Sequence, residues 1–234
     1  MKITWFGHSC FRLDMDGASV LIDPFITGNP VCPVDQATAS KGVSHVIVSH
    51  GHDDHLGDCA GIAAANGATL TANYEICLWA AARGVDKINP MNSGGTVDLG
   101  PFKVSLTVAH HSSASTANGG PAVYLGNPHG IVITPKQGKP LYHAGDTDIF
   151  GDMALIAEIH QPKIGILPIG DRFTMGGRTA ALAARRYFAF DLVIPCHFGT
   201  FGLLDPDAST FVAGMTGAPT TRVAVLEPGG SIEA

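Results

Sequence analysis

Charged residues are scarce in this chain of 234 residues: Asp, Glu, Lys and Arg together make up 15%, well below the roughly one quarter of an average globular protein. The balance is acidic, with a formal net charge of −6, and lysines and arginines are nowhere clustered. A protein that binds nucleic acid by neutralising phosphates needs the opposite distribution. We therefore expect no nucleic-acid partner.

Cysteines are few and dispersed: there are five, and no two of them form a C-x-x-C pair. An odd, scattered set excludes a disulfide framework and a zinc site built from cysteines. Long apolar runs are missing as well. The segment MKITWFGHSCFRL lacks the apolar stretch of a signal peptide, and no run approaches the ~18 residues of a membrane helix. We expect a cytoplasmic protein without a membrane partner.

The 29 glycines and 15 prolines stay below the level typical of disordered chains, and 45% of the residues are hydrophobic. Short apolar segments alternate with helical ones, which is typical of α/β layers, so we expect residues 1–234 to form one α/β domain. Strands are expected at 20–22, 46–48, 69–71, 102–108, 122–125, 130–134, 164–169, 192–194 and 223–225. Helices are expected at 73–84, 152–160, 178–189 and from Asp205-Pro206 onward.

Histidine is the residue type in excess, with 11 residues against 14 lysines and arginines. Three histidines fall within the segment HGHDDH (residues 50–55), directly after the apolar strand 46–48. Neutral imidazoles and ionised carboxylates are donors that zinc accepts near neutral pH. A glycine-containing loop after a buried strand lets His50 and His52 aim at one ion, while Asp54 and His55 aim at a second position nearby.

Other polar residues follow apolar strands in the same way. Sites in open α/β sheets gather at strand ends, so these residues are expected to converge at one edge of the fold. They are Asp23, His111, Asp146, Asp171 and His197.

The pattern H-x-H-x-D-H after a hydrophobic strand resembles the signature of the metallo-β-lactamase superfamily. The resemblance covers nearly the whole chain, with Asp23 ending an early strand, His111 ending the 102–108 strand, Asp146 in HAGDT and His197 in PCHFGTF. The segments GHSCFRL, LIDPF, ANYEI and PIGDRFTMG are similar to a narrower branch, the small bacterial metal-dependent hydrolases close to ascorbate-phosphate lactonases. This resemblance implies a four-layer αββα sandwich with metals at one edge of its two sheets.

The same resemblance implies a centre of two divalent metal ions, with zinc as the expected ion and manganese as the alternative. One ion would have three imidazole ligands: His50, His52 and His111. The other would be held by Asp54, His55 and His197, with Asp146 bridging both. Asp54 and His197 are also the expected catalytic residues.

Two adjacent histidines, His110 and His111, compete for one ligand position. His110 shares the strand face of Val104 and Leu106, whereas His111 directly precedes a Ser-Ser pair, as in the family pattern. We expect His111 to be the ligand and His110 to be a packed or supporting residue.

Further residues are candidates for supporting the ligands. Asp23 is expected to accept an imidazole N–H and to fix its tautomer. His8 could reach substrate or a ligand, and His143 lies three residues before Asp146. The remaining histidines are expected at the surface: His45, His129 and His160.

The segment PIGDRFTMG supplies candidates for substrate contact. Asp171 and Thr174 are expected near the pocket. Arg172 would favour an anionic substrate if it faced the site, because a guanidinium suits phosphate or carboxylate.

These observations predict a metal-dependent hydrolase in which a metal-bound hydroxide cleaves an ester-like bond of a small molecule. A lactone and a phosphodiester both suit such a centre. A di-iron redox protein on the same fold is one alternative, although that pattern has Glu where this chain has His52. A non-catalytic metal-binding module is the other. The expected partner is a small-molecule substrate, and the resemblance is compatible with a homo-oligomer.

Overall fold

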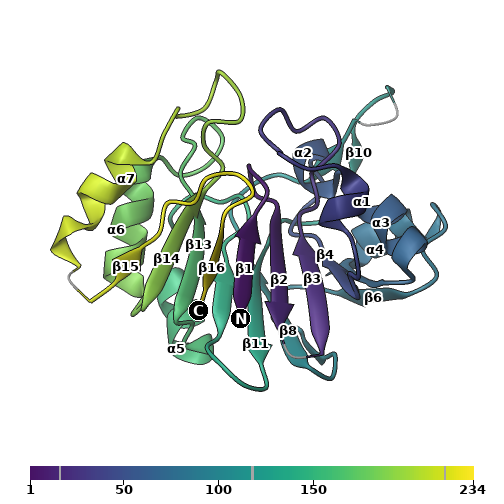
Figure 1. Ribbon diagram of the computed structural model, residues 1–234, viewed down its shortest axis with the longest axis horizontal. Helices are drawn as coiled ribbons and strands as arrows, with labels where there is room; N and C mark the ends of the chain where they lie inside the picture. Colours follow the sequence, from purple (N-terminus) through teal and green to yellow (C-terminus); the bar gives the residue numbers. More distant parts are fainter. Residues whose placement is uncertain (16, 117–118, 219) are drawn as a thin grey trace.

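Two mixed β-sheets face each other, and helices cover both of their outer faces (Figure 1). The computed structural model describes residues 1–15, 17–116, 119–218 and 220–234, and within these residues each of the two sheets has seven strands. The arrangement is the four-layer αββα sandwich that the family resemblance implies.

The first sheet combines antiparallel and parallel pairing. Strands β1, β2 and β3 pair antiparallel, and the sheet continues in parallel from β3 to β6. In spatial order its strands are β16 (Ser231–Glu233), β1 (Lys2–Trp5), β2 (Phe11–Met15), β3 (Ala18–Ile22), β4 (His45–Ile47), β5 (Thr69–Asn73) and β6 (Ile88–Met91).

The second sheet repeats this division. It is antiparallel from β7 to β12 and parallel from β12 to β15. In spatial order its strands are β15 (Arg222–Val223), β14 (Leu192–Cys196), β13 (Ile164–Pro168), β12 (Leu141–His143), β11 (His129–Pro135), β8 (Phe102–Val108) and β7 (Thr96–Asp98). A separate hairpin pairs β9 (Ala114–Ser115) with β10 (Val123–Tyr124).

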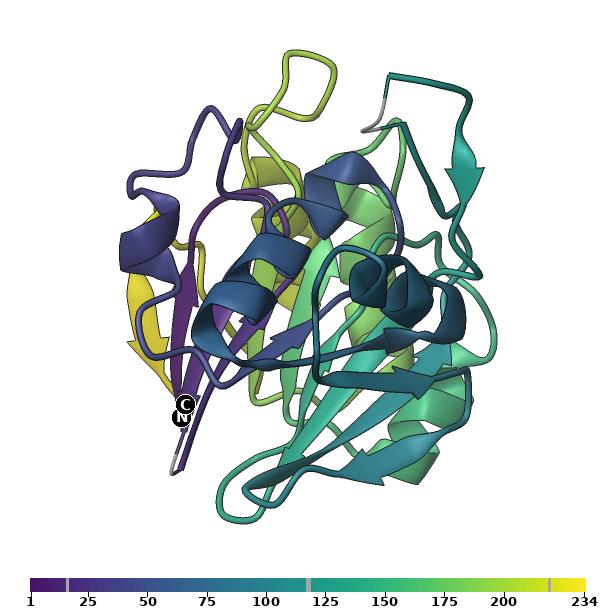
Figure 2. The same ribbon diagram turned by 90° about the vertical axis from the view of Figure 1, so that its right-hand side faces the viewer.

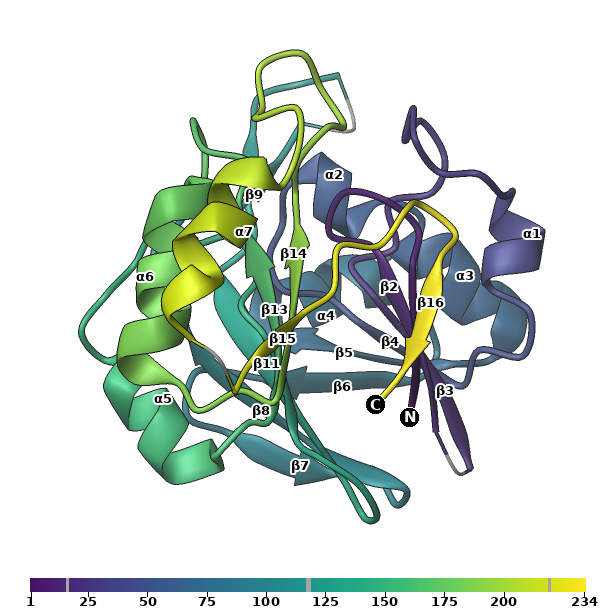
Figure 3. The same ribbon diagram turned by 60° about the vertical axis from the view of Figure 1, so that its left-hand side comes forward.

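The helices divide between the two outer faces. Beside the first sheet lie α1 (Gln36–Ala39), α2 (Asp53–Leu56), α3 (Cys59–Asn66) and α4 (Tyr74–Ala81) (Figure 2). Beside the second lie α5 (Met153–His160), α6 (Gly177–Tyr187) and α7 (Ser209–Gly214), which runs into the 3-10 turn Met215–Gly217 (Figure 3). None of the described helices combines the length and the apolar character that a membrane crossing requires.

Three apolar clusters hold the layers together. The central cluster lies between the sheets, where Ile3 and Leu13 of the first pack with Val104, Leu106 and Ile133 of the second. A second cluster lies under α1 to α4, and a third lies under α5 to α7. Burial of these side chains at roughly 25 cal/mol per Å² is the main stabilising term. The core thus fixes the sheets relative to each other, and with them the loops at their shared edge.

The helix expected to open at Asp205-Pro206 begins later, which corrects that prediction. The first residue of α7 is Ser209. The backbone of Asp205 is engaged elsewhere, because its N–H donates to Gly170 and its carbonyl accepts from Gly199. These bonds tie the preceding loop to the site, and the helix can start only after them.

Several short elements are not foreseen by the sequence pattern. The expected strand 223–225 is shorter, and the chain continues into β16, which pairs with β1. The amino group of Met1 donates to the carbonyl of Ala234, so both ends of the chain lie together. The loop 27–42 contains α1, whose N-cap Asp35 accepts from the N–H of Thr38. The N-cap of α4 is Asn73, as predicted, and its side chain accepts from the N–H of Ile76.

His129 is buried, in contrast to the expected surface position. It is the first residue of β11 and is 1% exposed. Burial lowers the pKa of its imidazole to about 4. His129 is therefore neutral in the folded protein at pH values where the unfolded chain, with a histidine pKa near 6.5, already binds a proton.

This difference makes stability fall in acid. The contribution of His129 is fully present above pH 6.5 and is lost as the pH falls toward 4. In urea unfolding, lowering the pH from 7.5 to 5 should cost the wild type about 2 kcal/mol more than it costs the variant His129→Leu. Equal pH dependence of the two proteins would contradict the assignment, whatever their stabilities at pH 7.5.

Candidate metal centre

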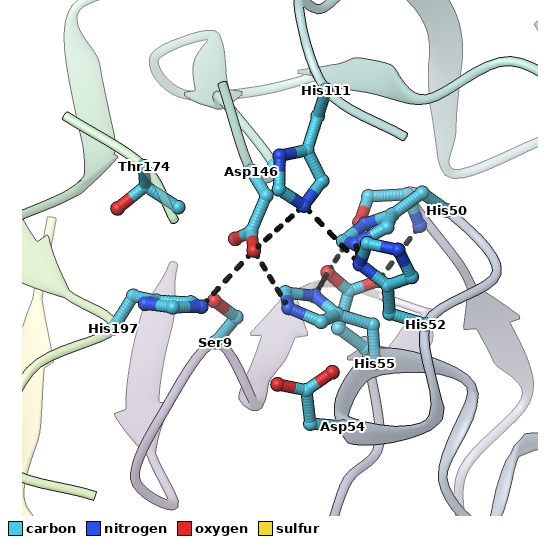
Figure 4. Close-up of polar contacts among 12 residues, drawn as sticks. Ser9, His50, His52, Asp54, His55, His111, Asp146, Thr174 and His197 are labelled. Atoms are coloured by element: carbon cyan, nitrogen blue, oxygen red, sulfur yellow. Dashed lines mark hydrogen bonds and ion pairs between the residues drawn. The ribbon is translucent and has the colours of Figure 1, made fainter. Parts of the chain in front are cut away.

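Loops from both sheets meet at one edge of the sandwich and bring the predicted side chains together (Figure 4). Asp23 follows β3, and His50 follows β4 in the first sheet. His111 follows β8, Asp146 follows β12 and His197 follows β14 in the second. Strand ends therefore determine the position of the cluster, as expected from the sequence.

Three imidazoles form what we call the histidine set: His50, His52 and His111. His50 Nε2 and His52 Nδ1 are 3.0 Å apart, and His111 Nε2 lies 3.2 Å from the same His52 Nδ1 (Figure 4). Three ring nitrogens thus face a common point. Burial, with a contribution from His55, lowers the pKa of His50 well below its usual range, and burial also lowers the pKa values of His52 and His111. All three are held in the neutral form that binds metals.

A second group, the mixed set, consists of His8, Asp54, His55 and His197. Each of these residues offers one nitrogen or oxygen atom, and the four atoms lie within 4.8 Å of one another. The carboxylate of Asp146 lies between the two sets. Its Oδ2 is 3.0 Å from His197 Nε2, 3.3 Å from His55 Nε2 and 3.6 Å from His111 Nε2.

Asp23 anchors the cluster from behind. Its fully buried carboxylate accepts from the N–H and hydroxyl of Ser49 and lies 2.8 Å from His55 Nδ1. Burial alone would lower the pKa of His55, but the carboxylates of Asp146 and Asp23 on its two sides raise it well above its usual range. The contact with Asp23 fixes the ring so that Nε2 points at Asp146, which is the supporting role predicted for this residue.

The donor atoms suit a metal ion. Oδ1 of Asp146 is buried, and it has no hydrogen-bond partner among the described residues. A buried, unsatisfied carboxylate oxygen is costly, and so is a group of imidazole nitrogens packed at 3.0 to 3.2 Å. Divalent cations would satisfy the nitrogen and oxygen lone pairs of both sets.

His8 is more closely involved than the sequence shows. Its Nε2 lies 3.1 Å from Asp54 Oδ2, its Nδ1 lies 3.0 Å from Thr200 Oγ1, and its ring centroid is 4.0 Å from that of His197. Burial, followed by the neighbouring His197, lowers the pKa of His8 to about 4. A neutral His8 can therefore donate from Nε2 to the carboxylate of Asp54.

Three residues of the cluster have left-handed backbone. His8, Asp23 and His197 have φ of 54°, 45° and 62°. Residues other than glycine rarely adopt this conformation. The surrounding hydrogen bonds, such as that from His197 N–H to the carbonyl of His8, hold these positions.

Two supporting candidates lie outside both sets. His143 is buried, with Nε2 3.3 Å from the carbonyl of Ser9, and its Nδ1 accepts from the N–H of Gly145. It therefore holds the loop that carries Asp146. His110 is exposed, and its ring stacks on Phe150 at 4.7 Å. Of the two adjacent histidines, His111 is the one in the cluster.

The candidates from PIGDRFTMG do not reach the cluster. Asp171 and Arg172 are exposed. Thr174 makes no contact with the ligand candidates drawn in Figure 4, and its hydroxyl donates to the carbonyl of Met175. The guanidinium of Arg172 lies 5.6 Å over the ring of Phe173. The orientation of Arg172 that would favour an anionic substrate is therefore not found.

Several contributors were missed by sequence reasoning. Ser49 lies between Asp23 and His50, with its Oγ 3.0 Å from His50 Nδ1, and its position directly before the histidine segment was a usable signal. Ser113 accepts from the N–H of Gly51. Thr200, which contacts His8, lies in an irregular loop where no periodicity marks it.

A cavity of about 690 Å³ opens onto the cluster. One part of its lining is polar and includes His52, Asp54, His111, Asp146 and His197. The rest is largely apolar. The size and the mixed lining are those of a small-molecule site.

Two facing mixed sheets with a histidine and aspartate cluster at their shared edge define the metallo-β-lactamase class of proteins. Residues 2–197 match the β-lactamase superfamily domain. A UPF0173 metal-dependent hydrolase from Methylocella silvestris is 59% identical over 218 residues, covering 93% of this chain and 94% of the relative. A UPF0173 metal-dependent hydrolase from Chelativorans sp. is 53% identical, and the match covers 100% of both chains.

Among solved structures, Igni18, a metallo hydrolase from the hyperthermophilic archaeon Ignicoccus hospitalis, matches with a TM-score of 0.88. It is 34% identical, and the match covers 99% of this chain and 97% of that one. The chain therefore belongs to the UPF0173 metal-dependent hydrolases of the β-lactamase superfamily.

The position of His197 depends on a close approach by Gly170. A Cβ at Gly170 would lie 2.0 Å from the backbone carbonyl oxygen of His197 and 2.8 Å from its Nδ1, so the variant Gly170→Ala must displace His197. We expect metal binding to weaken by roughly 10- to 100-fold, as for other changes behind a metal ligand. Competition with a chromophoric chelator measures this affinity.

Gly202→Ala is the matched control, because a Cβ there would meet nothing within 4 Å. It should bind metal like the wild type. Equal affinities of the two variants, both shown to be folded by circular dichroism, would mean that His197 does not contribute to metal binding.

Proposed function

We propose that the protein uses two divalent metal ions to hydrolyse an ester-like bond, a lactone or a phosphodiester, of a small molecule. The observation that carries this proposal is the convergence of donors at the cavity. His50 Nε2, His52 Nδ1 and His111 Nε2 face one point, and the mixed set faces a second across the carboxylate of Asp146. Two adjacent sites in a 690 Å³ cavity suit hydrolysis at a small substrate.

The histidine set would hold one ion. Asp54, His55 and His197 would hold the other, with Asp146 between them. Zinc is the proposed ion because imidazole and carboxylate donors suit it, and manganese is the alternative. When bound, such a pair lowers the pKa of water and polarises the carbonyl or phosphoryl oxygen of the substrate.

The chain itself supplies a positioned, ionised carboxylate. Burial alone would raise the pKa of Asp54, but the hydrogen bond from His8 and the nearby His55 lower it well below its usual range. The carboxylate is therefore ionised, is held by His8 Nε2 and lines the cavity. In this position Asp54 can orient a water molecule by accepting a hydrogen bond from it. His197, which also lines the cavity, is the second proposed catalytic residue.

A cytoplasmic setting, a small-molecule partner and a single domain remain part of the proposal, as does a homo-oligomer. The cysteines support a reducing compartment, since all five are free and four of them are buried.

Removing one donor tests the assignment. In His52→Ala and Asp146→Ala we expect the metal content to fall and hydrolysis to drop by roughly 1,000-fold, because the remaining donors no longer complete both sites. Mass spectrometric metal analysis and a panel of esters, lactones and phosphodiesters, measured on the same preparation, give both readouts.

His110→Ala serves as the matched control, because this exposed histidine adjoins His111 and contacts neither set. It should retain full metal content and activity. Unchanged metal stoichiometry in both His52→Ala and Asp146→Ala would refute the ligand assignment. Two iron ions with visible absorption would favour the redox alternative. A fully loaded protein that is inert across the panel would favour the non-catalytic module.

A further inference from the structure

Positive side chains are absent from most of the loops around the cavity. Lysine and arginine are missing from residues 13–40, 42–82, 104–135, 140–162 and 187–221, which include most of the loops that line it. Only the segment 171–178, which contributes Phe173 to the lining, brings cations near, as Arg172 and Arg178.

Neither of these arginines lines the cavity. Arg172 is exposed, and its Cζ lies over the ring of its neighbour Phe173, 5.6 Å from the ring centroid. Arg178 lines a separate groove against α7, together with Ser209 and Thr210. An anionic substrate would find no guanidinium or ammonium partner among the described residues of the cavity.

The metal ions themselves would leave little excess positive charge. Two divalent ions would bring four positive charges. Four carboxylates lie in or directly beside the cluster: Asp23, Asp53, Asp54 and Asp146. These carboxylates would offset much of the charge of the ions, and beyond the ions themselves the described lining of the cavity offers an anion no positive side chain.

The remaining wall of the cavity is apolar and aromatic. Phe25, Phe173, Phe201 and Leu204 line it. Phe25 and Phe201 lie with their ring centroids 6.3 Å apart, and Phe201 is 5.5 Å from the ring of His8. Phe173 and Phe201 are 53% and 40% exposed although they are large apolar side chains. Exposed aromatic groups at a cavity next to polar donors are typical of a binding site for an apolar group.

We propose that the substrate is an uncharged carboxylic ester with an aliphatic or aromatic acyl group, and that Phe173 and Phe201 bind that group and determine specificity. This inference rests on the proposed hydrolysis. The oxygen of water bonds to the carbonyl carbon, the ester C–O bond breaks, and the leaving alkoxide takes up a proton, which gives an acid and an alcohol. A phosphodiester, which carries a negative charge, is then disfavoured.

Paired esters with one leaving group test the charge preference on the metal-loaded protein. The para-nitrophenyl hexanoate and the para-nitrophenyl monoester of glutaric acid have acyl chains of similar length, but only the second carries a carboxylate. We expect kcat/KM to favour hexanoate by about 100-fold, since the carboxylate would lose water without gaining a partner. A preference for the glutarate ester, or for bis(para-nitrophenyl) phosphate, would overturn the proposal.

Variants test the two aromatic residues. Phe173→Ala and Phe201→Ala should each lower kcat/KM for hexanoate by about tenfold, and should change it for the short acetate ester by less than about twofold. Leu203→Ala is the control, because Leu203 is an exposed residue of the loop that carries Phe201 and does not line the cavity. This variant should hydrolyse the hexanoate and the acetate ester like the wild type. Equal losses on hexanoate and acetate would show a structural role and would overturn the specificity assignment.

A binding measurement separates this inference from the proposed reaction. Hexanohydroxamate and the hydroxamate of glutaric acid can be titrated calorimetrically into the metal-loaded protein without any turnover. Tighter binding of hexanohydroxamate, weakened in Phe173→Ala, supports the apolar subsite even if no ester is hydrolysed, and in that case only the proposed reaction fails. No preference between the two hydroxamates would overturn the subsite itself.

Discussion

The buried carboxylate of Asp146 is the constraint on which the metal centre depends. A carboxylate that is 3% exposed costs several kcal/mol unless positive charge or hydrogen bonds compensate it. Its Oδ2 contacts imidazoles from three segments: His55 in α2, which follows β4, and His111 and His197, which follow β8 and β14. Both sheets therefore contribute to one charge-balancing cluster, in addition to the apolar core between them. Asp146 thus joins the two sheets at the candidate metal centre.

Two neighbouring histidines, His50 and His55, differ in protonation because their surroundings differ. The ring centroids of His50 and His55 are 4.1 Å apart, and both side chains are fully buried. Their pKa values nevertheless shift in opposite directions, because carboxylates flank His55 on two sides whereas imidazoles surround His50. Residues 50–55 thus supply both a neutral imidazole to the histidine set, His50, and an imidazole whose charge is balanced by carboxylates, His55.

The pattern of apolar strands that end in polar residues predicted an α/β fold and a cluster at one edge, whereas the four-layer sandwich was implied by the family resemblance. His50 and His111 illustrate this, since the strand before each of them fixes where the side chain lies. The direction of Arg172 could not be predicted, because its left-handed backbone, with φ of 43°, reverses the chain locally. Strand β16 was missed because Ile232 is its one apolar residue, and its pairing with β1 joins opposite ends of the sequence. The burial of His129 depends on the packing of neighbouring segments, which the pattern of apolar residues along a strand does not reveal.

At His8, Asp23 and His197 the left-handed backbone lowers the stability of the fold, whereas the side chains at these positions form part of the cluster. Each such residue stores about 1 kcal/mol or more of conformational strain, which glycine would relieve. A glycine at any of them would also delete a side chain of the cluster. Selection for thermal stability alone would therefore drive this edge of the protein toward glycine and away from metal binding. In this chain histidine and aspartate occupy these positions, so the side chains of the cluster are present at the expense of the stability of the fold.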